Sequence, residues 1–114
     1  MLRVIIESPL SAVTRAAIEF NKDYARRAMK DSLSRGEAPY ASHLLFDQPG
    51  ILDELSKGDR ELGMRAGQAW YVCADKVVVY EDYGVTPGMR AGIDMATKYN
   101  IRVEFRRIDD VDQD

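Results

Sequence analysis

The sequence has few residues that form covalent or metal cross-links, with one cysteine, Cys73, and one histidine, His43, in 114 residues. A single cysteine excludes an internal disulfide, and the chain has no cysteine cluster that would hold zinc. We therefore predict neither a metal nor another cofactor. This cysteine content suits a reducing cytoplasm.

The sequence also has no long apolar run and no long basic run. No apolar run approaches the roughly 18 residues that a membrane span needs. Charge appears too early, at Arg3 and Glu7, for the start of the chain to be a signal peptide. The net charge is −3 and no long basic run occurs, which argues against duplex nucleic acid as the main partner. We expect a cytoplasmic protein that binds neither membranes nor duplex nucleic acid.

The composition is that of an ordinary globular domain, with 46% hydrophobic and 31% charged residues. A chain of this length forms one compact domain by default. We assign residues 1–108 to that domain. The last six residues, 109–114, are rich in aspartate and are predicted to form a flexible acidic tail.

Hydrophobic periodicity predicts alternating strands and helices. Strands are expected at 2–6, 37–46 (with its exit loop), 76–80 and 101–105, and helices at 12–35, 59–73 and 87–100. Residues 47–58 are expected to be a surface loop. This order predicts a single Rossmann-like (flavodoxin-like) three-layer α/β domain, with about four parallel strands and helices on both faces.

Two of the predicted helices carry apolar stripes. The first has Val13, Ala17, Phe20, Tyr24 and Ala28 at helical spacing, opposite a face of charged residues that includes Lys22, and Gly36 is its predicted left-handed cap. The second begins after Asp59 as N-cap and carries Leu62, Ala66, Ala69 and Cys73. Gly63 and Gly67 are four residues apart, a spacing that allows close packing against the sheet or a second subunit.

The stretch 77–92 combines an unbroken apolar run, a turn and a helix start. Burial on both faces is typical of a central parallel strand, here 76–80. Thr86 can cap the next helix with its hydroxyl, Pro87 suits the first helical position, and Gly88 leaves the backbone accessible. The free N–H groups of such a helix start favour an anion such as a phosphate.

Ligands of open α/β sheets bind beyond the carboxyl ends of the strands, where three loops are expected to meet. His43 and Asp82 are catalytic candidates, although a structural histidine and an aspartate that satisfies loop N–H groups are the alternatives. Arg60 and Arg90 lie in first turns of helices and are candidate anion contacts. The predicted ligand-binding residues are Ser8, Pro9, Leu10, Ser42, His43, Asp82, Gly84, Thr86, Gly88 and Met89.

Several segments together resemble a small uncharacterised family common in phage and prophage genomes. The resemblance rests on residues 5–10, 21–28, 36–44, 60–63 and 79–89, and it extends to about Arg106. That family is similar to the nucleoside 2-deoxyribosyltransferases and related nucleotide N-glycosidases. The resemblance implies a nucleoside or nucleotide ligand, self-association, and an aspartate in the loop after a strand, which matches Asp82. It also implies a nucleophilic glutamate on the following helix, but Gly92 stands at that position.

Three functions therefore stay open. The first is an enzyme acting on an N-glycosidic bond, in which Glu7, Glu81, Asp82 or His43 supports a hydrolysis that differs from the transferase reaction. The second is a non-catalytic phage-type protein that binds and sequesters a nucleotide or a nucleotide-derived signal. The third is an interaction protein that forms a homo-oligomer through a face with Gly63, Gly67 and Trp70.

Overall fold

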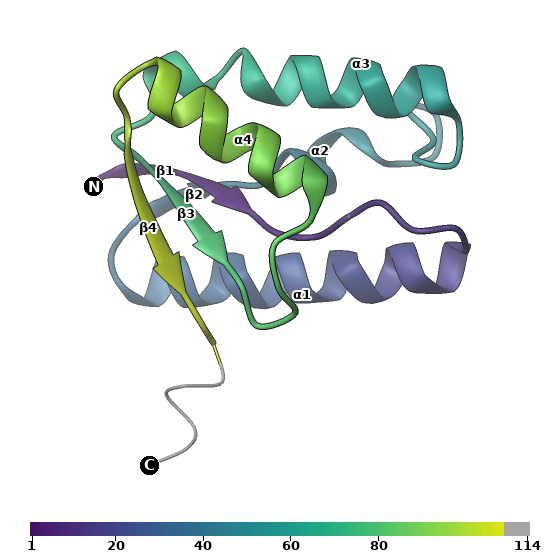
Figure 1. Ribbon diagram of the computed structural model, residues 1–114. Helices are drawn as coiled ribbons and strands as arrows, with labels where there is room; N and C mark the ends of the chain where they lie inside the picture. Colours follow the sequence, from purple (N-terminus) through teal and green to yellow (C-terminus); the bar gives the residue numbers. More distant parts are fainter. Residues whose placement is uncertain (109–114) are drawn as a thin grey trace.

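The computed structural model describes residues 1–108, so the predicted acidic tail lies outside the described residues. Strands and helices alternate along the chain (Figure 1). The strands are β1 (Arg3–Glu7), β2 (Ala38–Tyr40), β3 (Lys76–Tyr80) and β4 (Arg102–Arg106). The helices are α1 (Arg15–Ser34), α2 (Ser42–Phe46), α3 (Lys57–Gln68) and α4 (Pro87–Lys98), with a 3-10 helix η1 (Tyr71–Cys73).

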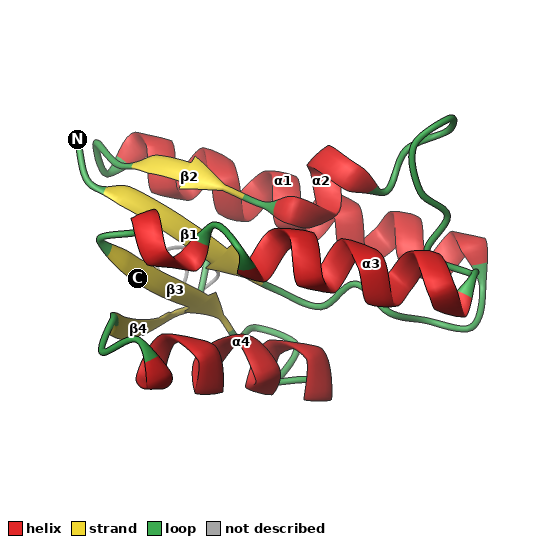
Figure 2. Ribbon diagram, turned by 90° about the horizontal axis from the view of Figure 1, so that it is seen from above, coloured by secondary structure: helices red, strands yellow, loops and turns green. Residues whose placement is uncertain are grey.

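The strands form one parallel sheet in the order β2-β1-β3-β4. Helix α1 covers one face of this sheet, and α3 and α4 cover the other (Figures 1 and 2). The predicted fold class, a Rossmann-like three-layer α/β domain, is confirmed. The chain leaves β1 toward one face and β3 toward the opposite face. The carboxyl ends of these two neighbouring strands therefore form the switch point at which open α/β sheets bind ligands.

Strand β3 is the centre of the core, and all five of its residues are buried, as its apolar run predicts. Alternation along a strand sends Val78 and Tyr80 toward α1, whereas Val77 and Val79 pack with residues of α4. The same alternation in β1 sends Ile6 toward α1 and Ile5 toward α4. The last residue of β1 therefore shares the α4 side with Ile5.

Helix α1 begins at Arg15, three residues later than predicted, because the Thr14 side chain accepts a hydrogen bond from the backbone N–H of Ala17 at 3.2 Å. It ends before Gly36, whose φ of +80° is the predicted left-handed cap. Both ends of the helix are thus set by local hydrogen bonding.

The predicted faces of α1 are only partly right. Tyr24 is buried, but Val13 and Phe20 on the same predicted stripe are exposed. Lys22, predicted on the solvated face, is buried instead. Its ammonium donates to the carbonyl oxygen of Asp47 at 2.5 Å and lies 3.4 Å from the carboxylate of the same residue. A partner on a distant loop thus changes which face of the helix is covered.

The predicted strand at 37–46 is shorter than expected. Only Ala38–Tyr40 pairs with β1, and the residues from Ser42 onward form α2. Pro39 lies inside this edge strand and has no N–H to donate, which fits a strand paired on one side only. Edge strand β2 is therefore followed directly by a short helix at the carboxyl edge of the sheet.

Helix α3 also differs from its prediction. It begins after Ser56 rather than Asp59, and it ends at Gln68, with η1 following as a separate turn. Its predicted apolar stripe does not face the core, because Leu62 and Cys73 are exposed. Trp70 is 53% exposed, and its ring packs against that of Tyr40.

The glycines of α3 explain where this helix packs. A Cβ at Gly67 would lie 2.8 Å from the Ser42 hydroxyl oxygen on α2, and one at Gly63 would lie 3.3 Å from a methyl carbon of Leu52. The close contact predicted from these glycines is therefore made with α2 and the 47–58 loop within the same chain.

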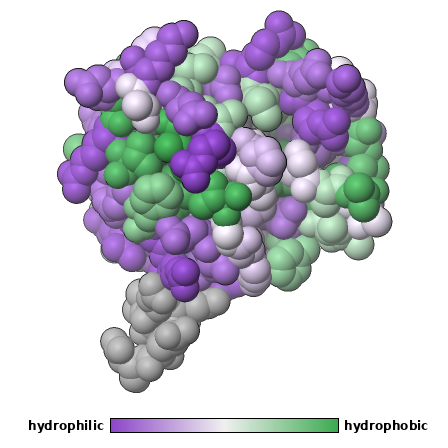
Figure 3. Space-filling view, in the orientation of Figure 1, coloured by the Kyte–Doolittle hydropathy of each residue, from purple (hydrophilic) through white to green (hydrophobic). Residues whose placement is uncertain are grey.

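The outer surface of residues 1–108 is mostly polar in the view of Figure 3, with an apolar patch where α4 and β4 meet. Met95, Ile101 and Val103 pack there against the core and stay partly exposed. Within the described residues, no helix has both the length and the apolar character that crossing a membrane requires.

A buried ion network holds the α1 side of the sheet together. The Glu37 carboxylate lies 2.6 Å from the Arg106 guanidinium and 2.8 Å from the Lys76 ammonium, and it accepts a hydrogen bond from the Ser32 hydroxyl. Arg106 and Lys76 also contact Glu104. Hydrogen bonds from Arg106 and other partners lower the pKa of Glu37 to about 2.

Replacing Arg106 by methionine is expected to leave Glu37 buried with less compensation and to destabilise the protein by about 3–5 kcal/mol. The free energy of unfolding in urea at neutral pH measures the effect. Arg102→Met is the matched control on the same strand, because that side chain is 72% exposed, and it should cost less than about 1 kcal/mol. Equal losses in the two variants would contradict a dominant role for the network.

Candidate functional site

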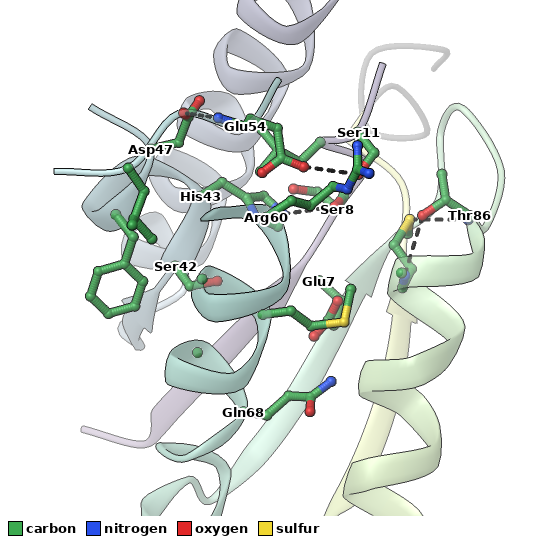
Figure 4. Close-up of a pocket in the computed structure, with 18 of the residues that line it drawn as sticks. Glu7, Ser8, Ser11, Ser42, His43, Asp47, Glu54, Arg60, Gln68 and Thr86 are labelled. Carbon is green, nitrogen blue, oxygen red and sulfur yellow. Dashed lines mark hydrogen bonds between the residues drawn. The ribbon is translucent and has the colours of Figure 1, made fainter. Parts of the chain in front are cut away.

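A cavity of about 500 Å³ opens at the carboxyl edge of the sheet, at the switch point between β1 and β3 (Figure 4). The end of β1 forms its floor, α2 and α3 form one wall, and the start of α4 forms the other. Seven of the ten predicted ligand-binding residues and one of the two predicted anion contacts line this cavity. They are Ser8, Leu10, Ser42, His43, Thr86, Gly88, Met89 and Arg60.

Glu7 is the most unusual group in the cavity. The residue is 9% exposed, and within residues 1–108 its carboxyl has neither a hydrogen bond nor an ion pair. Burial without a partner disfavours the charged form and raises the pKa of Glu7 to about 8. A carboxyl that is largely neutral at neutral pH can donate a hydrogen bond as well as accept one. Such perturbed groups concentrate at functional sites.

The space that Glu7 occupies is created by Gly92 on α4. A Cβ at position 92 would lie 2.1 Å from Glu7 Oε2 and 2.7 Å from the Tyr71 hydroxyl oxygen. No side chain fits there while Glu7 holds this position. Gly92 stands where the sequence resemblance implies a glutamate. In this structure the Glu7 carboxyl, from β1, occupies the space beside α4 that a side chain at position 92 would fill.

Ser8 and His43 form the middle of the cavity. The Ser8 hydroxyl is 2% exposed and has no hydrogen-bond partner within residues 1–108. His43 Nε2 lies 2.8 Å from the Ser8 carbonyl oxygen, and because a carbonyl only accepts, Nε2 carries the hydrogen. Burial lowers the pKa of His43, so its ring is neutral and its Nδ1 is an acceptor.

The start of α4 has the geometry that the sequence predicts. The Thr86 hydroxyl accepts a hydrogen bond from the backbone N–H of Met89 at 3.2 Å, and Pro87 is the first helical residue. The backbone N–H of Gly88 is not used by this cap, and a Cβ there would meet only the ends of side chains at 3.8 Å or more. This helix start is therefore accessible to a group in the cavity.

A strap formed by residues 47–56 closes the outer end of the cavity. Glu54 accepts a hydrogen bond from the Ser11 hydroxyl at 2.9 Å, and its backbone N–H donates to the Asp47 carboxylate at 3.0 Å. Burial raises the pKa of Glu54. Arg60 lies between this strap and the middle of the cavity, with no ion pair to a carboxylate among the described residues (Figure 4).

Four predicted site residues lie elsewhere. Asp82 is directed toward α1, where its carboxylate accepts hydrogen bonds from the Tyr24 hydroxyl and from the backbone N–H of Ile108. The alternative interpretation of Asp82, an aspartate that satisfies local donors, describes it better than a ligand contact does. Pro9, Gly84 and Arg90 are likewise absent from the cavity wall.

Apart from Arg60, the sequence did not indicate the contributions of α3 and of the strap. Gln68 and Tyr71 line the inner end of the cavity, and within residues 1–108 neither side chain has a hydrogen-bond partner. Met64, predicted as a packing residue, is part of the wall. Further lining residues outside the predicted set are Ser11, Phe46, Asp47, Leu52, Glu54, Asp59, Gly63, Gly67 and Pro87. For the inner end of the cavity, the sequence offered one signal, which is the charged residue Glu7 at the end of the buried strand β1.

Together, the fold and the cavity define a Rossmann-like α/β domain with a partly enclosed cavity, lined by apolar and polar side chains, at the carboxyl edge of its sheet. A family model described as a domain of unknown function, DUF7768, matches residues 2–106, and the chain therefore belongs to this family. The match spans every strand and helix of the structure. Searches of curated proteins and of solved structures return no match.

The raised pKa of Glu7 predicts a pH-dependent stability. Between the ordinary value of 4.5 and about 8, the unfolded chain releases this proton and the folded chain keeps it. This group therefore removes stability as pH rises through that window, by about 1.4 kcal/mol per pH unit. Glu7→Gln lacks the effect, so its melting temperature relative to the wild type should increase steadily from pH 5 to pH 8.

Glu61→Gln is the control, because Glu61 is exposed on α3 and lies outside the cavity wall. Its melting temperature should follow that of the wild type at every pH. Parallel curves for wild type and Glu7→Gln would contradict a neutral, buried Glu7.

Proposed function

We propose that this chain binds a nucleoside or nucleotide in the cavity and acts on its N-glycosidic bond. The observation that carries the proposal is a buried carboxyl, Glu7, which has no partner within residues 1–108 and lies at the switch point of the sheet, in a cavity that the accessible start of α4 also lines. Binding sites in open α/β sheets concentrate at this point. Perturbed carboxyl groups are common in enzymes that cleave glycosidic bonds.

The size and polarity of the cavity support a ligand of this class. A volume of about 500 Å³ lies within the usual range for small-molecule sites. Apolar side chains such as Leu10, Phe46 and Met64 offer surface to a planar ring. Polar groups lie at both ends, with Arg60 and the start of α4 at the outer end and Glu7 and Gln68 at the inner end (Figure 4).

The outer end suits one anionic group. Within residues 1–108, Arg60 forms no ion pair with a carboxylate, although its charge attracts that of Glu54, and the backbone N–H of Gly88 is not used by the Thr86 cap. A guanidinium and a helix N-terminus both favour a phosphate. This pairing supports a 5′-monophosphate as a better ligand than the corresponding nucleoside.

The second candidate function is binding without turnover, in which the protein sequesters its ligand. The observation that favours it is the glycine at position 92, which leaves α4 without a carboxylate directed into the cavity. Both functions use the same cavity. They differ in one product, the free base.

The test is a panel of 2′-deoxynucleosides, ribonucleosides and their 5′-monophosphates. Ligands are expected to raise the melting temperature of the protein, and chromatography is expected to detect free base after incubation with at least one of them. Stabilisation with no base release, even at high protein concentration, would favour the sequestering function. No stabilisation by any member of the panel would overturn the proposal.

Arg60→Gln tests the outer end. Loss of one charge-assisted contact is expected to weaken monophosphate binding by about tenfold or more while leaving nucleoside binding nearly unchanged. Arg65→Gln is the matched control on the same helix, because that exposed side chain is not part of the cavity wall. Titration calorimetry compares the two variants. Equal losses for nucleoside and monophosphate would rule out a phosphate contact at Arg60.

A further inference from the structure

We propose that the inner end of the cavity holds the base of the ligand and that Glu7, as a neutral acid, gives its proton to a ring nitrogen of that base as the N-glycosidic bond breaks. This inference rests on the proposed function and assigns the chemical role of its central residue. A proton donor differs from a carboxylate nucleophile in its protonation state, so pH can distinguish the two roles.

Within residues 1–108, no group accepts a hydrogen bond from the Glu7 carboxyl. Oε2 lies against the backbone of Gly92, where even a Cβ would be only 2.1 Å away. The Tyr71 hydroxyl also lies beside Gly92, where the same Cβ would be 2.7 Å from it, and Gln68 lines the cavity. Neither side chain has a hydrogen-bond partner within residues 1–108. An acid, an amide and a phenol without partners together form the inner end.

This set of groups suits a heterocyclic base. The Gln68 amide has one donor and one acceptor side by side. It can therefore form two hydrogen bonds with a base that has an acceptor and a donor at adjacent positions. A neutral Glu7 adds a donor for a ring nitrogen. The Met64 side chain and the Tyr71 ring supply apolar surface beside these polar groups.

The elements around Glu7 keep the carboxyl neutral. The ionisable residues that line the cavity near it are Arg60 on α3, His43 on α2 and Tyr71 on η1, with Asp47, Glu54 and Asp59 toward the strap. No residue of α4 that lines the cavity is ionisable. On β3, the residue paired with Glu7 is the apolar Val79. Burial is the cause of the raised pKa of Glu7, at about 8, and no charged neighbour contributes.

The step balances with water as the second reactant. The C1′–N bond breaks and its electron pair moves to the base, while the Glu7 proton moves to a ring nitrogen. The oxygen of a water molecule then bonds to C1′, and a proton from that water returns to the Glu7 carboxylate. The products are free base and sugar, and the acid is restored. General acid catalysis of this kind contributes about 10²–10⁴-fold to a rate.

The experiment measures base release from the nucleotide panel between pH 5 and pH 10. A proton donor predicts a rate that falls about tenfold per pH unit above pH 8. Glu7→Gln should lose at least 100-fold in rate while its melting temperature still rises with the same ligands, because the amide keeps the shape and a donor group. The rate that this variant retains should no longer change near pH 8.

A second variant tests the position of the carboxyl. Gly92→Ala forces Glu7 to move and should lower the rate of base release at least tenfold. Gly58→Ala is the matched control, because a Cβ at Gly58 would have no neighbour within 4 Å. That control should match the wild type in both rate and melting temperature.

The outcomes separate the inference from the proposed function. Base release that rises above pH 8, or that persists undiminished in Glu7→Gln, overturns the proton-donor role and leaves the N-glycosidic activity standing. Ligand binding without base release by the wild type overturns the activity and the inference with it. Absence of binding across the panel overturns the nucleotide site itself.

Discussion

The parallel pairing of β1 with β3 is the constraint on which the rest of this structure depends. Their register sets Glu7 opposite Val79, so both strands end at the same level of the sheet. Because β1 continues toward α1 and β3 continues toward α4, the loops after these strands diverge to opposite faces. A cavity forms where they part, and the buried residues of the same two strands supply much of the core.

The two faces of this sheet handle buried charge in opposite ways. On the α1 side, Glu37 is surrounded by Arg106, Lys76 and Ser32, and these partners lower its pKa to about 2. On the α4 side, Glu7 is also buried but has no partner within residues 1–108, and its pKa rises to about 8. The first arrangement stabilises a fold by pairing charge. The second carries a cost in stability at neutral pH.

Local signals predicted much of this molecule correctly. The buried strand β3, the Thr86 cap with Pro87 after it, and the left-handed Gly36 all follow from interactions within a few residues of each other. The predicted faces of α1 and α3 were less accurate. Lys22 is buried by a partner on a distant loop, and Gly67 of α3 makes its close contact with α2 rather than with a strand. No periodicity within a helix can reveal a partner that lies elsewhere in the chain.

The sequence by itself determined the fold class and the edge of the sheet at which a cavity would lie, because alternating strands and helices permit few topologies. Only the tertiary structure decided which carboxyl lies at the inner end of that cavity. Asp82 turns toward α1 to meet the Tyr24 hydroxyl, and Glu7 turns toward α4 into space left by Gly92. The physical reason is that both choices depend on contacts between residues more than 50 positions apart, which the neighbouring sequence does not record.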